Sequence, residues 1–252
     1  MNNCPESAEL EYDALNITLK ARNRMTNFFP LMFAAVVGFA HAFEIDHLLA
    51  VSNIVTQRRT IWEALRDGIY WGLGHTSTIM VIGILMILAK VGISEGAFHY
   101  FEACVGFMLM FLGAHRIWKT WESEKEHLLM HTRQQEHDHR LAFGVGLVHG
   151  LAGSGALVLL VMTEIHETLP AVIYLLIFGA GSIAGMMLAS GLFSLPFSQK
   201  IAHGSPWRWR LTLLSSLLCI FFGVRVIWEA VIKNLKRFCC RNVGYVGKVT
   251  FL

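Results

Sequence analysis

The sequence predicts an all-α, polytopic membrane protein with six transmembrane helices that form two inverted three-helix repeats. Three observations predict this fold. Only 15% of the 252 residues are charged and 54% are hydrophobic, whereas about 25% of the residues in soluble domains are charged. Six apolar runs are long enough to cross a bilayer, and short patterns of the first half recur in the second half.

The six apolar runs account for most of the chain. A transmembrane helix needs about 20 predominantly apolar residues, and each run approaches or exceeds this length before a polar segment interrupts it. The third run is the shortest. The fifth run is long enough for its helix to tilt or break, and its several glycines and Pro196 would make a break easier. The predicted spans are residues 28–51, 69–89, 101–117, 141–163, 169–197 and 211–232.

The second half of the chain repeats patterns of the first half. The segment Phe111 to Trp118, at the end of run three, matches Phe221 to Trp228 at the end of run six. Gly38 to His41 matches Gly146 to His149 at nearly the same separation. Because three spans are an odd number, the second unit must enter the membrane from the opposite side. The alternative is that helices rich in small residues merely look alike.

These patterns divide the chain into five regions. Residues 1–27 form a polar tail without the apolar core of a signal peptide. Residues 28–118 form the first three-helix repeat, and residues 141–232 form the second. A loop rich in histidine and acidic residues, 119–140, joins the repeats, and a basic tail, 233–252, follows them.

The basic residues of the loops predict the orientation of the spans. Positive charges gather in the loops after spans one, three and five, whereas the other two loops contain Lys90 alone. By the positive-inside rule the first set of loops is cytoplasmic, which puts both tails outside. Basic residues in the tails favour the opposite orientation. The loops carry more weight here, because all five alternate consistently.

Four polar residues interrupt the first apolar run, namely His41, Glu44, Asp46 and His47. A charged group near the bilayer centre costs roughly 2.5–3.5 kcal/mol on insertion scales, so residues of this kind mark functional sites. On an ideal helix His41, Glu44 and His47 share one face, whereas Asp46 points elsewhere. Asp46 therefore requires either a bend in the helix or a role outside the set of metal ligands.

Two further histidines, His75 in span two and His149 in span four, are expected at about the depth of His41. Imidazole suits nickel, zinc and copper ions, and a mixed set of histidines and carboxylates excludes a soft copper(I) site built on thiolates. The six residues together predict a central site for a divalent transition-metal ion. Because imidazole binds metal only when neutral, we expect binding to depend on pH. The alternative is that each histidine is a buried residue bonded to a neighbouring helix.

These residues carry a resemblance to a known family. The segment His41-Ala-Phe-Glu-Ile-Asp46-His47 resembles the H-x-x-x-x-D-H signature of the nickel/cobalt transporter superfamily. Leu73 to Thr78 is similar to the second motif of that family, and Gly146 to Gly155 is similar to the third. The six-span length looks most like the UreH-like, urease-accessory branch.

The resemblance implies transport of Ni²⁺ or Co²⁺. It also implies that His41, Asp46 and His47 are the motif residues of the site and that His75 is a further candidate. Glu44 departs from the pattern, since the family commonly carries Asp at this position. The longer side chain could alter the metal preference, with Zn²⁺ as the other candidate ion.

The loop between the two repeats is a second candidate metal-binding segment. Histidines and acidic residues alternate in it, and family members that export metal resemble it in having histidine-rich loops. Such a loop could collect metal at the membrane surface, or it could be a solvated linker. The candidate ligands are His127, His131, His137 and His139.

The sequence predicts a transporter and not an enzyme. No ATP-binding motif is present, so the energy would come from a metal or proton gradient or from a partner. The runner-up is a membrane accessory factor that binds nickel for enzyme maturation without conducting it. Ser154, with His75 or His149 as base, would suggest an intramembrane serine hydrolase. That interpretation leaves the carboxylates near His41 unexplained.

The predicted partners are a divalent metal ion, the lipid bilayer and, for the accessory factor, nickel-enzyme maturation proteins. No prosthetic cofactor is expected. Nucleic acid is excluded, because no compact basic stripe with interleaved aromatic residues appears outside the tails. The expected location is an integral, multi-pass position in the membrane, which in a bacterium would be the cytoplasmic membrane.

Overall fold

A computed structural model describes residues 31–56, 58, 60–89, 95–126, 139–151, 168–195 and 206–246. Every regular element in this part of the chain is a helix, which confirms the all-α prediction. The helices are Leu31–His41, α2 (Ile45–Val55), α3 (Ile61–Ala89), α4 (Glu95–Glu126), Arg140–Leu151, α6 (Thr168–Ser194) and α7 (Pro206–Val246).

Four of these helices are long and apolar enough to cross a membrane. They are α3, α6, the stretch His99–Glu122 of α4 and the stretch Trp209–Lys233 of α7. The bent pair formed by Leu31–His41 and α2 qualifies as a fifth span if it counts as one, and Arg140–Leu151 is a shorter apolar helix. The chain is therefore an integral, multi-pass membrane protein.

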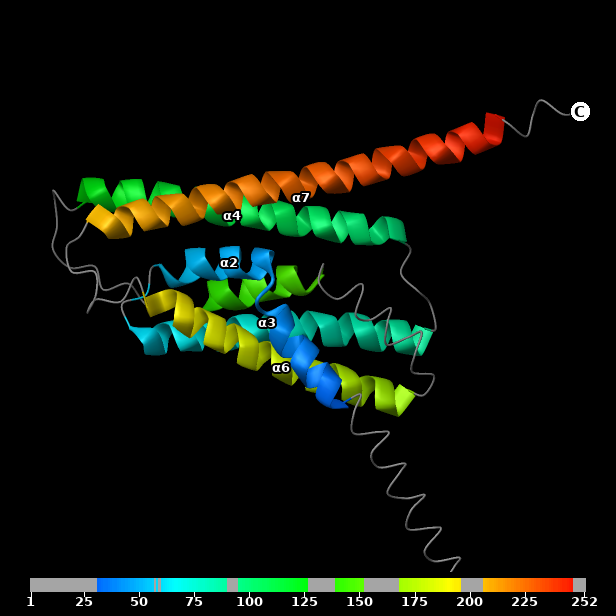
Figure 1. Ribbon diagram of the computed structural model, residues 1–252, viewed down its shortest axis with the longest axis horizontal. Coiled ribbons are helices and arrows are strands. Elements are labelled where there is room, and N and C mark those ends of the chain that lie inside the picture. Colours follow the sequence, from blue (N-terminus) through cyan, green and yellow to red (C-terminus); the bar gives the residue numbers. More distant parts are fainter. Residues whose placement is uncertain are drawn as a thin grey trace, which may run out of the picture.

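The long helices form two antiparallel pairs with two shorter helices between them (Figure 1). α4 packs along α7 on one side, and α3 packs along α6 on the other. In this view α2 and the helix Arg140–Leu151 lie between these pairs, and α2 contacts all four long helices.

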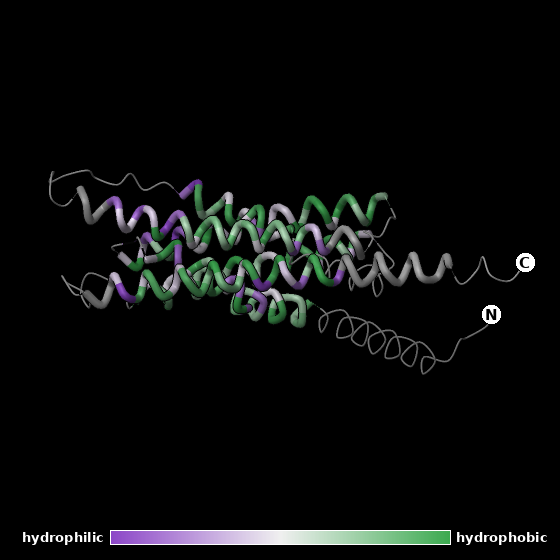
Figure 2. Tube along the Cα trace, turned by 90° about the horizontal axis from the view of Figure 1, so that it is seen from above, coloured by the Kyte–Doolittle hydropathy of each residue, from purple (hydrophilic) through white to green (hydrophobic). Residues whose placement is uncertain are grey.

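Hydrophobic residues predominate along the long helices (Figure 2). Large apolar side chains are exposed on the outer surfaces, including Leu85 at 61%, Phe111 at 64% and Phe221 at 69% exposed. A soluble protein rarely exposes so extensive an apolar surface. Contact with lipid acyl chains accounts for it, which agrees with the membrane assignment.

The first predicted span is not one continuous helix. Its two parts are inclined at 55° to each other. The amide of Phe43 donates to the oxygen of Ala40, and the amide of Glu44 donates to the oxygen of His41. Glu44 then adopts an extended conformation, with φ −64° and ψ 152°, before α2 begins. The turn is the bend that was predicted from the sequence as one explanation for Asp46, and it rotates α2 relative to the preceding helix, so the single face expected on an ideal helix does not apply here.

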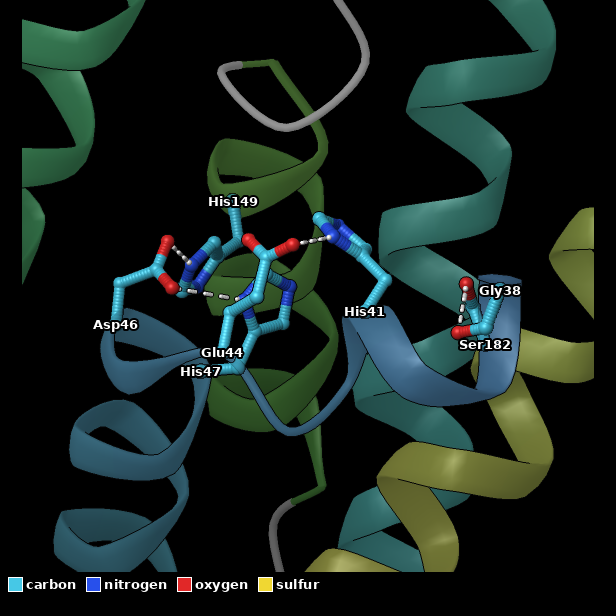
Figure 3. Close-up of polar contacts among 7 residues, drawn as sticks. All are labelled: Gly38, His41, Glu44, Asp46, His47, His149 and Ser182. Carbon is cyan, nitrogen blue, oxygen red and sulfur yellow. Dashed lines mark hydrogen bonds and ion pairs between the residues drawn. The ribbon is translucent and has the colours of Figure 1, made fainter. Parts of the chain in front are cut away.

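Small residues bring the shorter helices close to the long ones. A Cβ atom at Gly38 would collide with the backbone oxygen of Phe178 in α6. Likewise, a Cβ atom at Gly146 would collide with the backbone oxygen of Trp71 in α3. The hydroxyl of Ser182 donates to the oxygen of Gly38 over 3.0 Å (Figure 3). Small residues at such crossings let membrane helices pack backbone to backbone.

Candidate metal centre

Five of the six predicted ligands meet in the interior of the bundle. His41 ends the first helix, Asp46 and His47 lie in the first turn of α2, and His75 and His149 come from α3 and Arg140–Leu151. His47, His75 and His149 are fully buried, and His41 is 6% exposed. Figure 3 shows His41, Asp46, His47 and His149 around the turn between the first helix and α2.

Glu44 fixes the orientation of His41. The Nδ1 atom of His41 lies 2.8 Å from Oε1 of Glu44. A carboxylate only accepts hydrogen bonds, so Nδ1 carries the proton and the Nε2 atom of a neutral ring keeps its lone pair. This Nε2 atom is buried and has no hydrogen-bond partner among the described residues. The contact therefore leaves one nitrogen of His41 able to bind a metal ion.

Asp46 orients two more imidazoles in the same way, by accepting a hydrogen bond from one nitrogen of each ring. Its Oδ1 atom lies 3.1 Å from Nδ1 of His47, and its Oδ2 atom lies 3.0 Å from Nε2 of His149. Each of these ring nitrogens donates to the carboxylate, so the other nitrogen of each neutral ring carries a lone pair. Both of those nitrogens, Nε2 of His47 and Nδ1 of His149, are buried and lack a partner within the described segments.

His75 completes the cluster without such a carboxylate contact. Neither of its buried ring nitrogens has a hydrogen-bond partner in the described part of the chain. Its ring centroid lies 5.3 Å from those of both His41 and His47. His47 also lies against His149, with ring centroids 4.0 Å apart.

The ligand atoms fall into two groups that share His47. His41, His47 and His75 each offer a ligand atom within 4.8 Å of the others, and so do Asp46, His47 and His149. Buried polar atoms are normally hydrogen-bonded. A divalent cation held by these nitrogens would satisfy several of the unpartnered atoms at once. The donor set therefore fits a transition-metal ion, and the carboxylates would hold the ligating rings in place.

Glu44 contacts the centre but lies outside both groups. Its side chain is 57% exposed and bonds to His41. Among the loop histidines, His139 is described and bonds to Asp67, away from the two groups. The other three, His127, His131 and His137, lie outside the described residues, as does Ser154.

Sequence reasoning missed three residues near the centre. Trp71 is buried, and its ring contacts those of His47 and His149. Arg58 and Asp67 form a buried ion pair, although both were assigned to the loop before span two. The four-residue spacing of Asp67, Trp71 and His75 could have identified Asp67 and Trp71, because it places one such residue on each successive turn of a helix.

Comparison with known proteins gives two relatives. The chain is 36% identical over 176 residues to the urease accessory protein UreH of Bacillus sp. (strain TB-90), covering 67% of this chain and 77% of that protein. It is 25% identical over 195 residues to the chloroplast protein FOR GROWTH AND FERTILITY 2 of Arabidopsis thaliana. That alignment covers 72% of this chain but 51% of the plant protein, so the chain spans about half of it.

No family model matches the chain, and no solved structure matches it. The UreH alignment nevertheless includes most of both proteins at substantial identity. The buried histidine cluster and the multi-pass architecture accompany this likeness. The chain belongs to the UreH-like family of urease accessory proteins, to which the chloroplast protein is related.

Proposed function

We propose that the protein carries Ni²⁺ or Co²⁺ across the membrane by alternating access through the central histidine and carboxylate site. The observation that carries the proposal is the convergence of unpartnered ring nitrogens from His41, His47 and His75 inside a multi-pass bundle. Zn²⁺ remains the competing ion, because the same ligands suit it. The ion is the substrate of the protein, and no resident prosthetic group is part of the proposal.

The location of the site supports transport. In secondary transporters, substrate sites lie near the bilayer midplane, where interrupted helices meet between two repeats. Here three residues of the ligand groups, His41, Asp46 and His47, flank the break between Leu31–His41 and α2. The helix Arg140–Leu151 brings His149 from the second half of the chain. Both predicted repeats therefore contribute to one site.

Six spans in two inverted repeats form part of the proposal, and the close helix contacts support it. Gly38 of the first half meets Phe178 of the second half, and Gly146 of the second half meets Trp71 of the first half. Exchanging the two halves converts one contact into the other, because Gly38 matches Gly146 and Trp71 occupies nearly the position of Phe178 in its repeat.

A second pair of contacts obeys the same exchange. Gly181 meets the backbone of Ala35, and Gly74 meets the backbone of Phe143. The antiparallel course of α3 and α6 in Figure 1 agrees with inversion of one half relative to the other.

The outer pair of helices repeats this arrangement. Gly113 of α4 meets the backbone of Ser216 in α7, and Gly223 of α7 meets the backbone of Gly106 in α4. Each residue has its counterpart 110 positions away, which is the separation of the matching motifs in runs three and six. Three independent contact pairs therefore support a two-fold relation between the halves.

The second candidate function is a non-enzymatic accessory factor that binds nickel for enzyme maturation without conducting it. The name of the UreH relative, a urease accessory protein, favours this alternative. Both candidates use the same histidines, so binding alone does not separate them. Movement of metal across the membrane does.

Metal accumulation in cells that express the full chain tests the proposal. Cells with the wild-type protein should differ in Ni²⁺ or Co²⁺ content from cells without it, and His47→Ala should abolish that difference, because His47 belongs to both ligand groups. His115→Ala is the matched control, since His115 stacks on Phe111 outside the centre. Equal metal content with wild type and His47→Ala, at equal expression, contradicts transport.

A further inference from the structure

A second buried polar cluster lies at the end of the bundle where α3 begins. Asp67 in α3 is 1% exposed. Its Oδ1 atom accepts from Nη2 of Arg58 over 2.9 Å and from Nδ1 of His139 over 2.7 Å. Its Oδ2 atom accepts from Nε of Arg58. We call Arg58, Asp67 and His139 the Asp67 cluster.

The Asp67 cluster connects both halves of the chain. Arg58 follows α2, and His139 directly precedes the helix that carries His149. Tyr70 of α3 stacks on the ring of His139, with centroids 4.9 Å apart and an interplanar angle of 8°. The helix that supplies His149 is thus attached, through the residue just before it, to α3 and to the segment that follows α2.

The cluster lies beside the metal centre along α3. Asp67 precedes His75 by two turns, or about 12 Å at 1.5 Å per residue. Trp71 lies one turn from each, is buried, and contacts the rings of His47 and His149. Trp71 therefore separates the Asp67 cluster from the metal-binding histidines.

Two buried polar atoms close to the Asp67 cluster along α3 lack hydrogen-bond partners within the described segments. They are Nε1 of Trp71 and the hydroxyl oxygen of Ser190 in α6. Ser190 is fully buried, and its hydroxyl lies against Gly68, the residue that follows Asp67. Unpartnered buried groups in a native structure need an explanation. Water entering this region in another state of the protein would satisfy both atoms.

We propose that the Asp67 cluster is a closed gate between the metal centre and the end of the bundle at which α3 begins. This inference rests on the proposed transport function. The desolvation of a buried ion pair offsets much of its attraction, so a separated and hydrated pair lies close to it in free energy. The cluster is therefore suited to open and close during a transport cycle. Loss of the Asp67 carboxylate removes the acceptor that Arg58 and His139 share and favours the hydrated state.

The charge distribution indicates which side this gate closes. The cluster lies where α2 and α6 end and where α3 and α7 begin (Figure 1). These ends adjoin the loops after spans one, three and five, which the positive-inside rule assigns to the cytoplasm. The gate therefore controls access from the cytoplasmic side.

Thiol accessibility in inverted membrane vesicles tests the gate. The full chain receives Ser190→Cys, a nearly isosteric change, and is treated with a membrane-impermeant thiol reagent. The adduct at position 190 is quantified by mass spectrometry, so the native cysteines remain in place. We expect slow labelling with Ser190→Cys alone. Adding Asp67→Asn should raise the rate at least about tenfold, the effect of roughly 1.4 kcal/mol on the opening equilibrium.

Three controls make the result decisive. Glu102→Gln replaces Asp67→Asn as the matched variant, because Glu102 is also a carboxylate bonded to a histidine, His99, but lies outside the cluster. It should leave the labelling rate unchanged. His139→Gln replaces the ring N–H donor by an amide N–H donor and leaves the Asp67 carboxylate in place, so it should raise the labelling rate by less than Asp67→Asn. Native Cys219, which is fully buried, reports unfolding and should stay unlabelled.

Two results of the labelling experiment would contradict the gate. Equal rates with and without Asp67→Asn mean that the cluster does not restrict access to position 190. Labelling of position 190 and Cys219 together means that Asp67 only stabilises the fold. The assay requires no metal, so it is independent of the transport test. No rise in labelling with intact metal flux rejects the gate alone, whereas a rise in a protein without flux rejects transport.

Discussion

At the scale of single residues, the carboxylates of the candidate centre orient three of the imidazoles and leave one nitrogen of each ring able to bind a metal ion. Asp46 uses one oxygen on His47 and the other on His149, and Glu44 bonds to His41. Each contact selects the ring tautomer whose remaining nitrogen has a lone pair. This arrangement gives the acidic residues beside His41 and His47 a role in orienting the rings.

Asp46→Asn tests this role. The amide keeps the shape of the side chain, but only its oxygen accepts hydrogen bonds, so one of the two imidazoles loses its partner. We expect Ni²⁺ affinity to fall by about 10–100-fold, as for other outer partners of metal-ligating histidines. Equilibrium binding to the purified protein in detergent measures it. Glu229→Gln, which alters an exposed pair with Arg225, is the control, and equal affinity of wild type and Asp46→Asn would contradict the role.

The histidines of the buried cluster could be identified from the sequence, but the contacts of Asp46 could not. His41 and His47 are conspicuous because polar residues are costly inside an apolar run. The relation of Asp46 to His149 depends on the turn after His41, where the chain leaves the helix without a proline to mark the position. Periodicity assumes a regular helix, so the sequence could indicate that Asp46 needs a bend but not which side chains the bend would bring to it.

At the scale of helices, glycines at backbone crossings determine where His149 lies. Gly146 faces the backbone oxygen of Trp71, whereas a Cβ atom at Gly144, two residues earlier in the same helix, would meet nothing within 4 Å. The two positions share a helix and a residue type, so they form a matched pair.

Gly146→Ala should therefore displace the helix and lower stability, while Gly144→Ala should not. Overpacking of this kind typically costs about 1–3 kcal/mol. Replacing a glycine by alanine inside a helix without steric conflict gains about 0.5–1 kcal/mol. Thermal unfolding in detergent should show a lower Tm for Gly146→Ala and an unchanged or higher Tm for Gly144→Ala. Equal Tm values for the two variants would mean that the crossing is not tightly packed.

The boundaries of helices could be predicted less well than their existence. Apolar runs located the long helices, but α3 begins at Ile61 rather than near residue 69. Asp67 was therefore taken for a loop residue, although its ion pair with Arg58 lets it lie buried inside the helix. Hydropathy alone does not reveal such pairing, because each charge lowers the score of the run that contains it.

At the scale of the whole molecule, the exchange of helix contacts between the halves favours an even number of spans. Four long helices and one bent pair are described, and the shorter helix Arg140–Leu151 lies in the predicted fourth span, which would bring the number of spans to six. An even number places both tails on one side of the membrane, whereas five spans would place them on opposite sides.

Epitope tags inserted in residues 1–27 and 233–252 test this expectation. Because six spans return the chain to its starting side, both tags should be accessible from the same face of sealed cells or vesicles. The loop charges predict the outer face. Antibody or protease accessibility before and after permeabilisation gives the answer, with a known cytoplasmic protein as the control for leakage. Tags on opposite faces would contradict six spans and the inverted repeat.

Metal flux through the purified protein in liposomes tests the central claim most directly. A trapped fluorescent indicator reports Ni²⁺ entry into vesicles that contain this chain alone, which separates transport from delivery to a maturation partner. We predict entry with wild type and with His115→Ala, and none above empty liposomes with His47→Ala. Flux that His47→Ala leaves intact would contradict the central site, and tight Ni²⁺ binding without flux by the wild type would contradict transport.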